Sequence, residues 1–305
     1  MFEIPSLRPE TRYGLPPADQ LLFNREYIIG YSYLLRQASW AMELIDPSNK
    51  SVLVDRVDLF REDTRIPAMF RAELADYKAS GHDRGHLISS ADRRASRIEN
   101  SETFLLSNMS PQKAELNRKL WKELEEEVRL LAFDFPEVYA ICGPLFDIGK
   151  PIEVIGNRAN TDDKNQVVIP IPHAYFKSIL AETVDGKLVL WSFVMQNSDL
   201  TGPTTDYLVP TRDIEIRAGL TLWDRLRGEE MEKLKAKKGS ATAFKKAVAN
   251  GKVADKAKGD KRKELAQELG IDELSIATEF LADNPKLAQL VLELRKGKGA
   301  EESPL

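Results

Sequence analysis

The sequence predicts an α+β fold with a helical extension at its C-terminal end. Three observations carry this prediction: β-rich runs gather between residues 138 and 197, one long helical pattern covers residues 110–135, and the composition changes after Arg227. Within residues 1–227 strand and helix signals are mixed, as in a fold that combines a sheet with helices. We therefore expect a sheet flanked by helices, followed by a helical appendage.

Three runs are rich in β-branched and aromatic residues and predict strands. They are "VYAICG" at 138–143, "NQVVIPI" at 165–171 and "KLVLWSFVMQN" at 187–197. The "VDG" at 184–186 is a turn signal directly before the third run. We expect a hairpin there.

The strongest helical pattern is "SPQKAELNRKLWKELEEEVRLLAFDF", with Ser110 as the expected N-cap and Pro111 in the first turn. An apolar stripe at helical spacing follows, formed by Leu116, Leu120, Leu124, Val128 and Leu131. Trp121 is expected to be a core anchor and not a platform for base stacking. The pattern predicts one helix that packs on the sheet.

Charge is distributed unevenly, and it marks the domain boundary that we place near Arg227. From Lys233 to Lys263 the chain has twelve Lys or Arg and two Asp, a net charge of +10. Few large apolar residues interrupt this stretch, so residues 228–263 predict a basic linker or solvated helix. Residues 264–305 recover helical periodicity and predict a small helical extension, which leaves 1–227 as the main domain.

Composition excludes several classes of protein. The chain has 305 residues, 42% of them hydrophobic, which suffices for a large core. A single cysteine, Cys142, excludes an internal disulfide and a thiolate zinc site. No apolar run reaches membrane-spanning length, and "MFEIPSLRPE" lacks the order of a secretory signal, so the sequence as it stands predicts a soluble cytoplasmic protein. The net charge of −4 argues against indiscriminate coating of nucleic acid.

The stretch "HDRGHLISSADRR", from His82 to Arg94, concentrates titratable side chains. For a histidine in such company the ordinary interpretation is a hydrogen-bonded structural residue, and it is strongest for His82 and His173. His86 differs because Arg84 lies two residues before it and Gly85 permits a close backbone approach. An imidazole base beside fixed cations is what hydrolysis of a phosphodiester requires.

These residues carry a resemblance to a known family. "DRGHL" with "AD", then "FLLSNMSPQ", "LN", "W" and "LEEEVR", resembles the DNA/RNA non-specific endonucleases, which are ββα-metal (His-Me finger) nucleases. "VYAICGPLFD", "IPHAYFKSIL", "WSFVMQN" and "TRDIEIRAGLTLWDRL" follow in the family's order, so the resemblance covers about residues 20–226. It implies a central, mainly antiparallel sheet and a metal-dependent endonuclease that cleaves DNA, and possibly RNA, with little sequence preference and leaves 5′-phosphate ends.

The resemblance also assigns roles to residues. His86 is the general base, Asn117 is the one direct protein ligand of Mg²⁺ or Mn²⁺, and Glu125 acts on that cation through water. Arg84 and Arg129 lie near the phosphate. The polar positions around them are Asp83 beside the base, Asn108 and Gln112 lining the site, and an upstream arginine that is either Arg56 or Arg61.

The spacing of Asn117 and Glu125 limits their roles. Eight residues of straight helix separate them by roughly 12 Å and about 80° of azimuth, so both cannot touch one ion. A water-mediated role for Glu125 is the more natural one, particularly if Asn117 lies at a distorted helix start. The competing interpretation of Glu125 is a solvated residue on the acidic face of "ELEEEVR".

Two alternatives remain open at this point. The chain could be an inactive nucleic-acid-binding module, or an effector gated by a partner or ligand at its C-terminal extension. The resemblance favours a homodimer, since one branch of the family forms dimers. For the basic segment Lys233–Lys263, added affinity for nucleic acid and a role as a spacer are equally supported.

Overall fold

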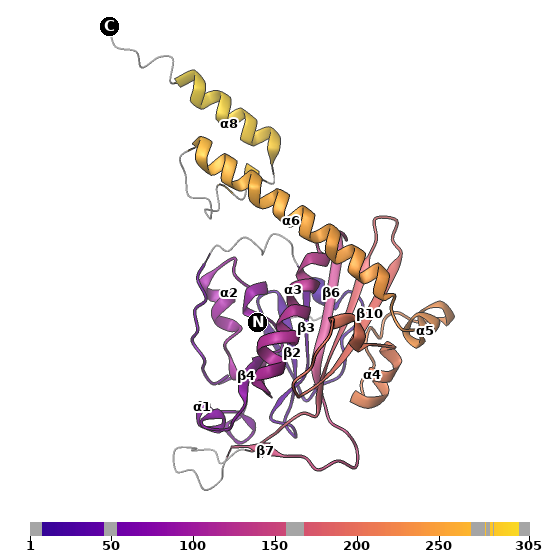
Figure 1. The fold of residues 1–305 in the computed structure, drawn as a ribbon. Coiled ribbons are helices and arrows are strands. Elements are labelled where there is room, and N and C mark those ends of the chain that lie inside the picture. The colour runs from indigo at the N-terminus through magenta and orange to yellow at the C-terminus, as the bar shows by residue number, and fades with distance from the viewer. Residues whose placement is uncertain are drawn as a thin grey trace.

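The computed structural model describes residues 8–45, 54–156, 168–269, 278, 281–282 and 284–298. Within these residues the centre is a seven-stranded sheet in the order β1-β2-β3-β6-β9-β10-β11, and every neighbouring pair of strands is antiparallel. The α+β prediction is confirmed (Figure 1). The strands of this sheet are β1 (Gln20–Asn24), β2 (Tyr27–Ser32), β3 (Gln37–Ile45), β6 (Glu137–Leu145), β9 (Ala174–Glu182), β10 (Leu188–Gln196) and β11 (Leu208–Val209).

Helices cover both faces of the sheet. One face packs against α3 and the first half of α6, and the other packs against the region of α4. The helices are α1 (Leu74–Tyr77), α2 (Arg97–Glu102), α3 (Lys122–Leu131), α4 (Thr211–Ala218), α5 (Glu229–Ala236), α6 (Ala241–Leu269) and α8 (Pro285–Lys298). Because both faces are covered, the central strands carry apolar side chains on both sides.

The predicted strands at 138–143 and 187–197 are confirmed as β6 and β10. The "VDG" turn joins β9 to β10, with Gly186 at φ +76° and its N–H donating to the Thr183 carbonyl at 2.8 Å. Of the run at 165–171, residues 165–167 lie outside the described residues. Ile169–Pro170 forms β8, which pairs with the short strand β7 (Val154–Ile155).

The predicted start of the long helix was wrong. Ser110 and Pro111 lie in strand β5 (Met109–Gln112), which pairs with β4 (Asp83–His86), and the helical residues begin only at Ala114. The Ser110 hydroxyl donates to Gln37 Oε1 at 2.6 Å and the Pro111 carbonyl accepts from the Tyr175 hydroxyl at 2.8 Å. These tertiary hydrogen bonds override the local capping signal.

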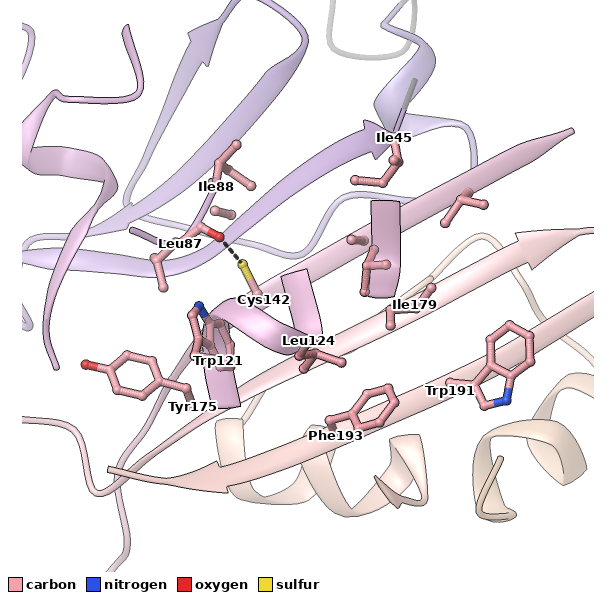
Figure 2. Packing of buried hydrophobic residues seen from close by; sticks show 14 of the residues in the cluster. Ile45, Leu87, Ile88, Trp121, Leu124, Cys142, Tyr175, Ile179, Trp191 and Phe193 are labelled. Carbon is pink, nitrogen blue, oxygen red and sulfur yellow. Dashed lines mark hydrogen bonds between the residues drawn. The ribbon is translucent and has the colours of Figure 1, made fainter. Parts of the chain in front are cut away.

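The apolar stripe of that helix is confirmed, since its five members are all buried. Trp121 is a core residue, 1% exposed, and lies with Leu124 against the sheet (Figure 2). The Cys142 thiol on β6 donates to the Leu87 carbonyl at 3.1 Å, directly after β4. The sheet thereby fixes the end of the strand that carries His86.

The prediction of a solvated segment after Arg227 was wrong for its first half. Lys235 is 1% exposed, and its ammonium donates to Glu215 Oε1 at 3.0 Å and to the Leu222 carbonyl. Phe244 packs edge-on against Trp191, with ring centroids 5.5 Å apart. The packed body of the protein therefore extends well into α6.

The second half of α6 continues beyond the body and packs against α8 (Figure 1). A small apolar cluster joins them, and the Lys261 ammonium donates to the Ala282 carbonyl at 2.8 Å. The buried members of this cluster are Leu265, Leu269, Leu281, Ala282 and Ala288. Within the described residues no helix is long and apolar enough to cross a membrane.

Candidate active site

A cavity of about 560 Å³ opens where the β4–β5 ribbon meets α3. The ribbon, a π-helical turn at Leu116–Trp121 and α3 follow one another as a ββα unit. The cavity is lined by Arg56, Phe60, Asp83, Arg84, His86, Ser89, Ser90, Ala91, Asn117, Arg118, Lys122, Glu125, Glu126 and Arg129. Six of the residues predicted for the site therefore line this one cavity: Asp83, Arg84, His86, Asn117, Glu125 and Arg129.

The ribbon requires glycine between Arg84 and His86. A Cβ at Gly85 would lie 2.0 Å from Oε1 of Gln112, whose side chain crosses the strand there. Gln112 itself is buried behind the ribbon and does not line the cavity. Its role is to pack against the strand that presents His86.

Asn108 lies next to the cavity but not in its wall. Its side-chain amide donates to the carbonyls of Ile88 at 2.9 Å and Thr103 at 3.0 Å, and its oxygen accepts from the Ile88 N–H at 3.0 Å. All of these hydrogen bonds of the Asn108 side chain go to backbone groups. It fixes the direction of the chain just after His86.

His86 presents part of its ring to the cavity and is enclosed elsewhere. Phe104 packs edge-on against the imidazole with centroids 5.1 Å apart, and Phe60 lies 5.8 Å away. Nε2 is buried and has no hydrogen-bond partner among the described residues. Burial, followed by the charges of Arg56 and Arg84, lowers the pKa of His86 to about 3. The imidazole is therefore neutral at pH 7.

Of the two upstream arginines, the one that lines the cavity is Arg56. Its guanidinium lies 4.9 Å from the centroid of the Phe104 ring and donates to Ser90 Oγ at 3.3 Å, and it lines the cavity. Arg61 instead donates to the Ser101 carbonyl at 2.6 Å and stays outside the cavity wall. Arg84 lies over the Phe60 ring at 4.0 Å from its centroid.

Asp83 fixes the orientation of Asn117. The Asn117 amide nitrogen donates to Asp83 Oδ2 at 2.9 Å, and Arg118 donates to both oxygens of that carboxylate at 2.8 and 2.7 Å. An ionised carboxylate only accepts, so the NH₂ of Asn117 must face it and the amide oxygen must face away. Burial raises the pKa of Asp83, but the hydrogen bonds from Arg118 and Asn117 outweigh it and keep the pKa below its usual value.

The π-helical turn explains how Asn117 and Glu125 reach one cavity. Hydrogen bonds of the i→i+5 type widen the turn, so the azimuth calculated for a straight α-helix does not apply. Asn117 therefore lies in a distorted helix start, the condition that favours a water-mediated role for Glu125. Both side chains line the cavity, from positions eight residues apart.

Glu125 is not on a solvated face. It is 9% exposed, and its Oε1 has no hydrogen-bond partner among the described residues. Burial raises its pKa to about 7, against the opposing charges of Lys177 and Arg129. A buried carboxylate oxygen without a partner, at the wall of a polar cavity, fits an acceptor for ordered water.

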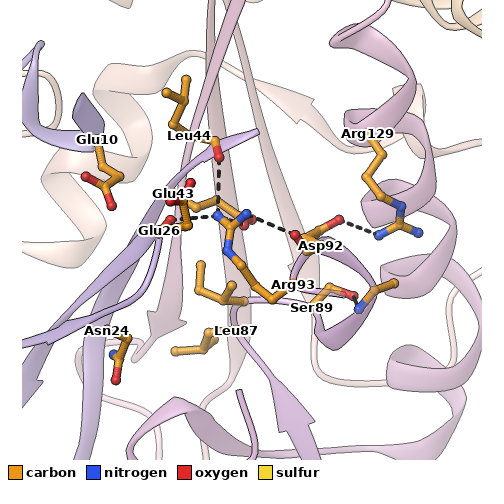
Figure 3. A network of polar contacts seen from close by, with 12 residues as sticks. Glu10, Asn24, Glu26, Glu43, Leu44, Leu87, Ser89, Asp92, Arg93 and Arg129 are labelled. Carbon is orange, nitrogen blue, oxygen red and sulfur yellow. Dashed lines mark hydrogen bonds and ion pairs between the residues drawn. The ribbon is translucent and has the colours of Figure 1, made fainter. Parts of the chain in front are cut away.

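A network of buried charges supports this wall from behind (Figure 3). Arg129 pairs with Asp92 at 2.8 Å, and the neighbouring Arg93, fully buried, pairs with Glu43 at 2.9 Å. Burial also raises the pKa of Glu43 to about 7. Arg129 thus reaches the cavity from a fixed position, and its side chain has little freedom to rearrange.

The side chains present fit a cation that keeps most of its water. Among the described residues no group of three His, Cys, Asp or Glu side chains gathers to hold a metal ion. What the cavity offers is the outward-facing oxygen of Asn117 and the unpartnered oxygen of Glu125. Oxygen ligands and few protein contacts match the preference of hard divalent cations.

Sequence reasoning missed several residues of the cavity, among them Arg118 and Phe60. Arg118 directly follows Asn117, but a basic residue on a helix gives no signal of its own. The structural interpretation of His173 agrees with its contacts, because Nδ1 accepts from the Asp147 N–H at 2.9 Å and Nε2 lies 3.0 Å from the Pro151 carbonyl. His82 Nδ1 similarly lies 3.1 Å from the Ser80 carbonyl.

Known proteins are similar to this chain in sequence. The sequence profile of the DNA/RNA non-specific endonuclease family matches residues 8–229. Human mitochondrial endonuclease G is 37% identical over 221 residues, which are 69% of this chain and 71% of that protein. A nuclease of Syncephalastrum racemosum is 37% identical over 229 residues, 69% of each chain.

A solved structure agrees with the sequence relatives. The crystal structure of an EndoG/EndoGI complex, on the mechanism of EndoG inhibition, matches with a TM-score of 0.66 at 31% identity, over 76% of this chain and 96% of that one. The profile match spans the ββα unit, the sheet and the cavity. The chain therefore belongs to the DNA/RNA non-specific endonuclease family, whose members are metal-dependent nucleases, and is an endonuclease of the endonuclease G type.

Proposed function

We propose that this cavity hydrolyses phosphodiester bonds with His86 as the general base, Asn117 as the direct ligand of Mg²⁺ or Mn²⁺, and Glu125 acting on that cation through water. One observation carries the proposal. A neutral imidazole lines the same polar cavity as Asn117, whose NH₂ donates to Asp83 and so turns its amide oxygen away from that carboxylate. The expected products carry 5′-phosphate ends.

His86 is suited to accept a proton from water. Nε2 is buried without a hydrogen-bond partner among the described residues, so we assign the proton-accepting lone pair to Nδ1 and the hydrogen to Nε2. Burial and the neighbouring arginines keep this lone pair free at neutral pH. A base in reach of water contributes about 10²- to 10⁴-fold in rate.

The arginines address the phosphate. Arg84 and Arg56 are held over aromatic rings, and Arg129 is held by Asp92, so each reaches the cavity without a large loss of side-chain freedom. A divalent cation at Asn117 supplies Lewis-acid polarisation of the phosphate when bound. These contacts address phosphate and not bases, which supports cleavage with little sequence preference.

Digestion of nucleic acids tests the proposal. Supercoiled plasmid, linear duplex and structured RNA are each incubated with the full chain and Mg²⁺, Mn²⁺ or a chelator. We expect nicking and then fragmentation with either cation, ligatable 5′-phosphate ends, and no cleavage with chelator. Cleavage that persists in chelator, or 3′-phosphate ends, would overturn the assignment.

An inactive binding module is not supported, because the relatives are named nucleases and the three central side chains share one cavity. The gated effector finds no support in the relatives either. We further propose the homodimer that the resemblance favours, and light scattering of the purified full chain tests it. A regulatory partner at residues 264–305 likewise stays a prediction.

A further inference from the structure

Helix α6 has one face on which residues are buried near both of its ends. Its buried positions are Phe244, Ala247, Val248, Gly251, Leu265, Ala266 and Leu269. At about 100° per residue these positions fall within roughly 100° of arc. The first four pack on the body of the protein, and the last three belong to the half that packs with α8.

Four lysines form a second stripe on the flank of this face, which we call the lysine stripe: Lys245, Lys252, Lys256 and Lys263. By the same rotation they fall within about 40° of one another and cover roughly 27 Å of the helix axis. All four are exposed. The acidic residue of α6 nearest to the stripe is Asp260, so the stripe keeps an excess of positive charge.

The stripe begins beside the helix that forms one wall of the cavity. Helices α3 and α6 are in contact, and Asn250 donates to Asp134 Oδ1 at 3.0 Å. Burial raises the pKa of Glu127 on α3, and Lys245 and Lys252 lie close enough to oppose that rise. Glu126, which directly precedes Glu127 on α3, lines the cavity. The exposed side of α3 thus leads from the cavity to the stripe.

We propose that the lysine stripe binds the phosphate backbone of a duplex whose scissile bond occupies the cavity. This inference rests on the proposed function for its substrate. It explains how the enzyme holds long nucleic acid although residues 1–227 carry a net charge of −6, since residues 228–305 contribute +2. Over roughly 27 Å a duplex presents on the order of 16 phosphate charges, enough to face every lysine of the stripe.

The chemistry of lysine suits this role. Ammonium groups on flexible stems act as point charges that follow a phosphate backbone without reading sequence. Each phosphate that is neutralised releases counterions and steepens the logarithmic salt dependence of binding by about 0.9. An acidic protein partner would use the same charges, so the experiment must measure duplex binding directly.

The test replaces the four stripe lysines by glutamine in the full-length chain, since Gln preserves helix propensity. A matched control replaces four exposed lysines that lie outside α6 and α8 and do not line the cavity: Lys150, Lys187, Lys233 and Lys237. Both sets are made in a His86→Ala background, and binding of a fluorescent 30-base-pair duplex is followed by anisotropy in chelator between about 50 and 300 mM salt. Circular dichroism checks that the helices are retained.

We expect the salt slope to fall by about 3 to 4 in the stripe variant, as four lost phosphate contacts require, and by less than about 1 in the control. An unchanged slope, or an equal fall in both sets, overturns the proposal. With His86 restored, hydrolysis of bis(p-nitrophenyl) phosphate, which is too small to reach α6, should be unaffected by the stripe substitutions. If the stripe variant lost that activity, its substitutions would be acting on the cavity itself, and the proposal would also be overturned. Absence of this hydrolysis in the parent chain would instead count against the proposed function alone.

Discussion

The two walls of the cavity handle charge in opposite ways. The ribbon wall holds a base, His86, whose pKa is lowered to about 3, and the helix wall holds an acid, Glu125, whose pKa is raised to about 7. Burial is the largest cause on both sides. Because burial disfavours whichever form is charged, it keeps the imidazole of His86 neutral and makes the carboxyl group of Glu125 reluctant to lose its proton.

His86 and Glu125 lie only 39 residues apart in the sequence, yet the two walls that hold them have different tasks. The ribbon wall is prepared without any cation, through aromatic packing around His86 and hydrogen bonds to Asp83. The helix wall gains its full charge only when a cation or an arginine compensates for burial, which is what a site that binds metal reversibly needs. The predictions below disturb one wall at a time.

Removal of the base should have the largest effect. His86→Ala is expected to lower the cleavage rate by at least about 10²- to 10⁴-fold, because no other imidazole lines the cavity among the described residues. Plasmid nicking at saturating Mg²⁺ measures this. His82→Gln is the matched control, since His82 lies on the same ribbon side but outside this cavity. Activity of His86→Ala within tenfold of the parent chain would remove His86 as the base.

Asn117→Ala should lose cation-supported cleavage, because the outward-facing amide oxygen is the direct ligand in this account. Asp83→Ala is expected to weaken the apparent cation affinity by about 10- to 100-fold, since it releases the amide of Asn117 without removing it. Cation titrations of the cleavage rate distinguish the two variants. If Asp83→Ala titrated like the parent chain, the orientation argument would be wrong.

On the helix wall the expected effect is smaller. Glu125→Gln keeps the shape of the side chain and should weaken the apparent cation affinity by about 10- to 100-fold, as for a residue that acts through water. The cleavage rate at saturating cation should be closer to that of the parent chain. Identical cation titrations for both proteins would exclude Glu125 from the site.

The smallest effect is on stability, and its sign differs between the walls. Between pH 3 and 6.5 the unfolded state binds a proton at His86 that the native state does not, so this group makes the metal-free protein less stable as pH falls. Between pH 4.5 and 7 the native state holds a proton at Glu125 that the unfolded state has lost, so this group lowers stability as pH rises.

Each group changes the slope of stability against pH by up to about 1.4 kcal/mol per pH unit. Urea unfolding of metal-free protein from pH 5 to 7 should therefore give a less positive slope of unfolding free energy against pH for His86→Gln than for the parent chain. For Glu125→Gln this slope should be less negative than in the parent chain, while Glu43 still contributes a fall in stability as pH rises. Parallel profiles for all three proteins would contradict the assigned shifts.

Much of the fold was predictable because local patterns and tertiary structure agree there. The stripe of Leu116 to Leu131 has helical period and is buried on one face, and the turn before β10 has its glycine where φ is positive. Strands β1 to β3 gave no clear alternation, because the sheet is covered on both faces. The strand at Ser110–Pro111 could not be predicted, since its hydrogen bonds go to Gln37 and Tyr175, far along the chain.

For the site, motif spacing predicted the residues that bear chemistry but not their supports. Asn108 and Gln112 were expected to line the cavity, yet both side chains serve the backbone or packing behind it. The sequence could not decide between Arg56 and Arg61, because Arg61 is held outside the cavity by a hydrogen bond to a backbone carbonyl that only the folded chain brings near. The π-helical turn that brings Asn117 and Glu125 together has no sequence signal that we recognise.

The state of the His86 imidazole tests the central claim most directly. In the metal-free full chain, the Cε1–H resonances of the three histidines are followed by NMR from pH 8 to 4 and assigned by His82→Gln, His86→Gln and His173→Gln. The account predicts that the His86 resonance keeps its neutral-form position down to about pH 4, because its pKa is lowered to about 3. A His86 midpoint near the ordinary value of 6.5 would contradict the account.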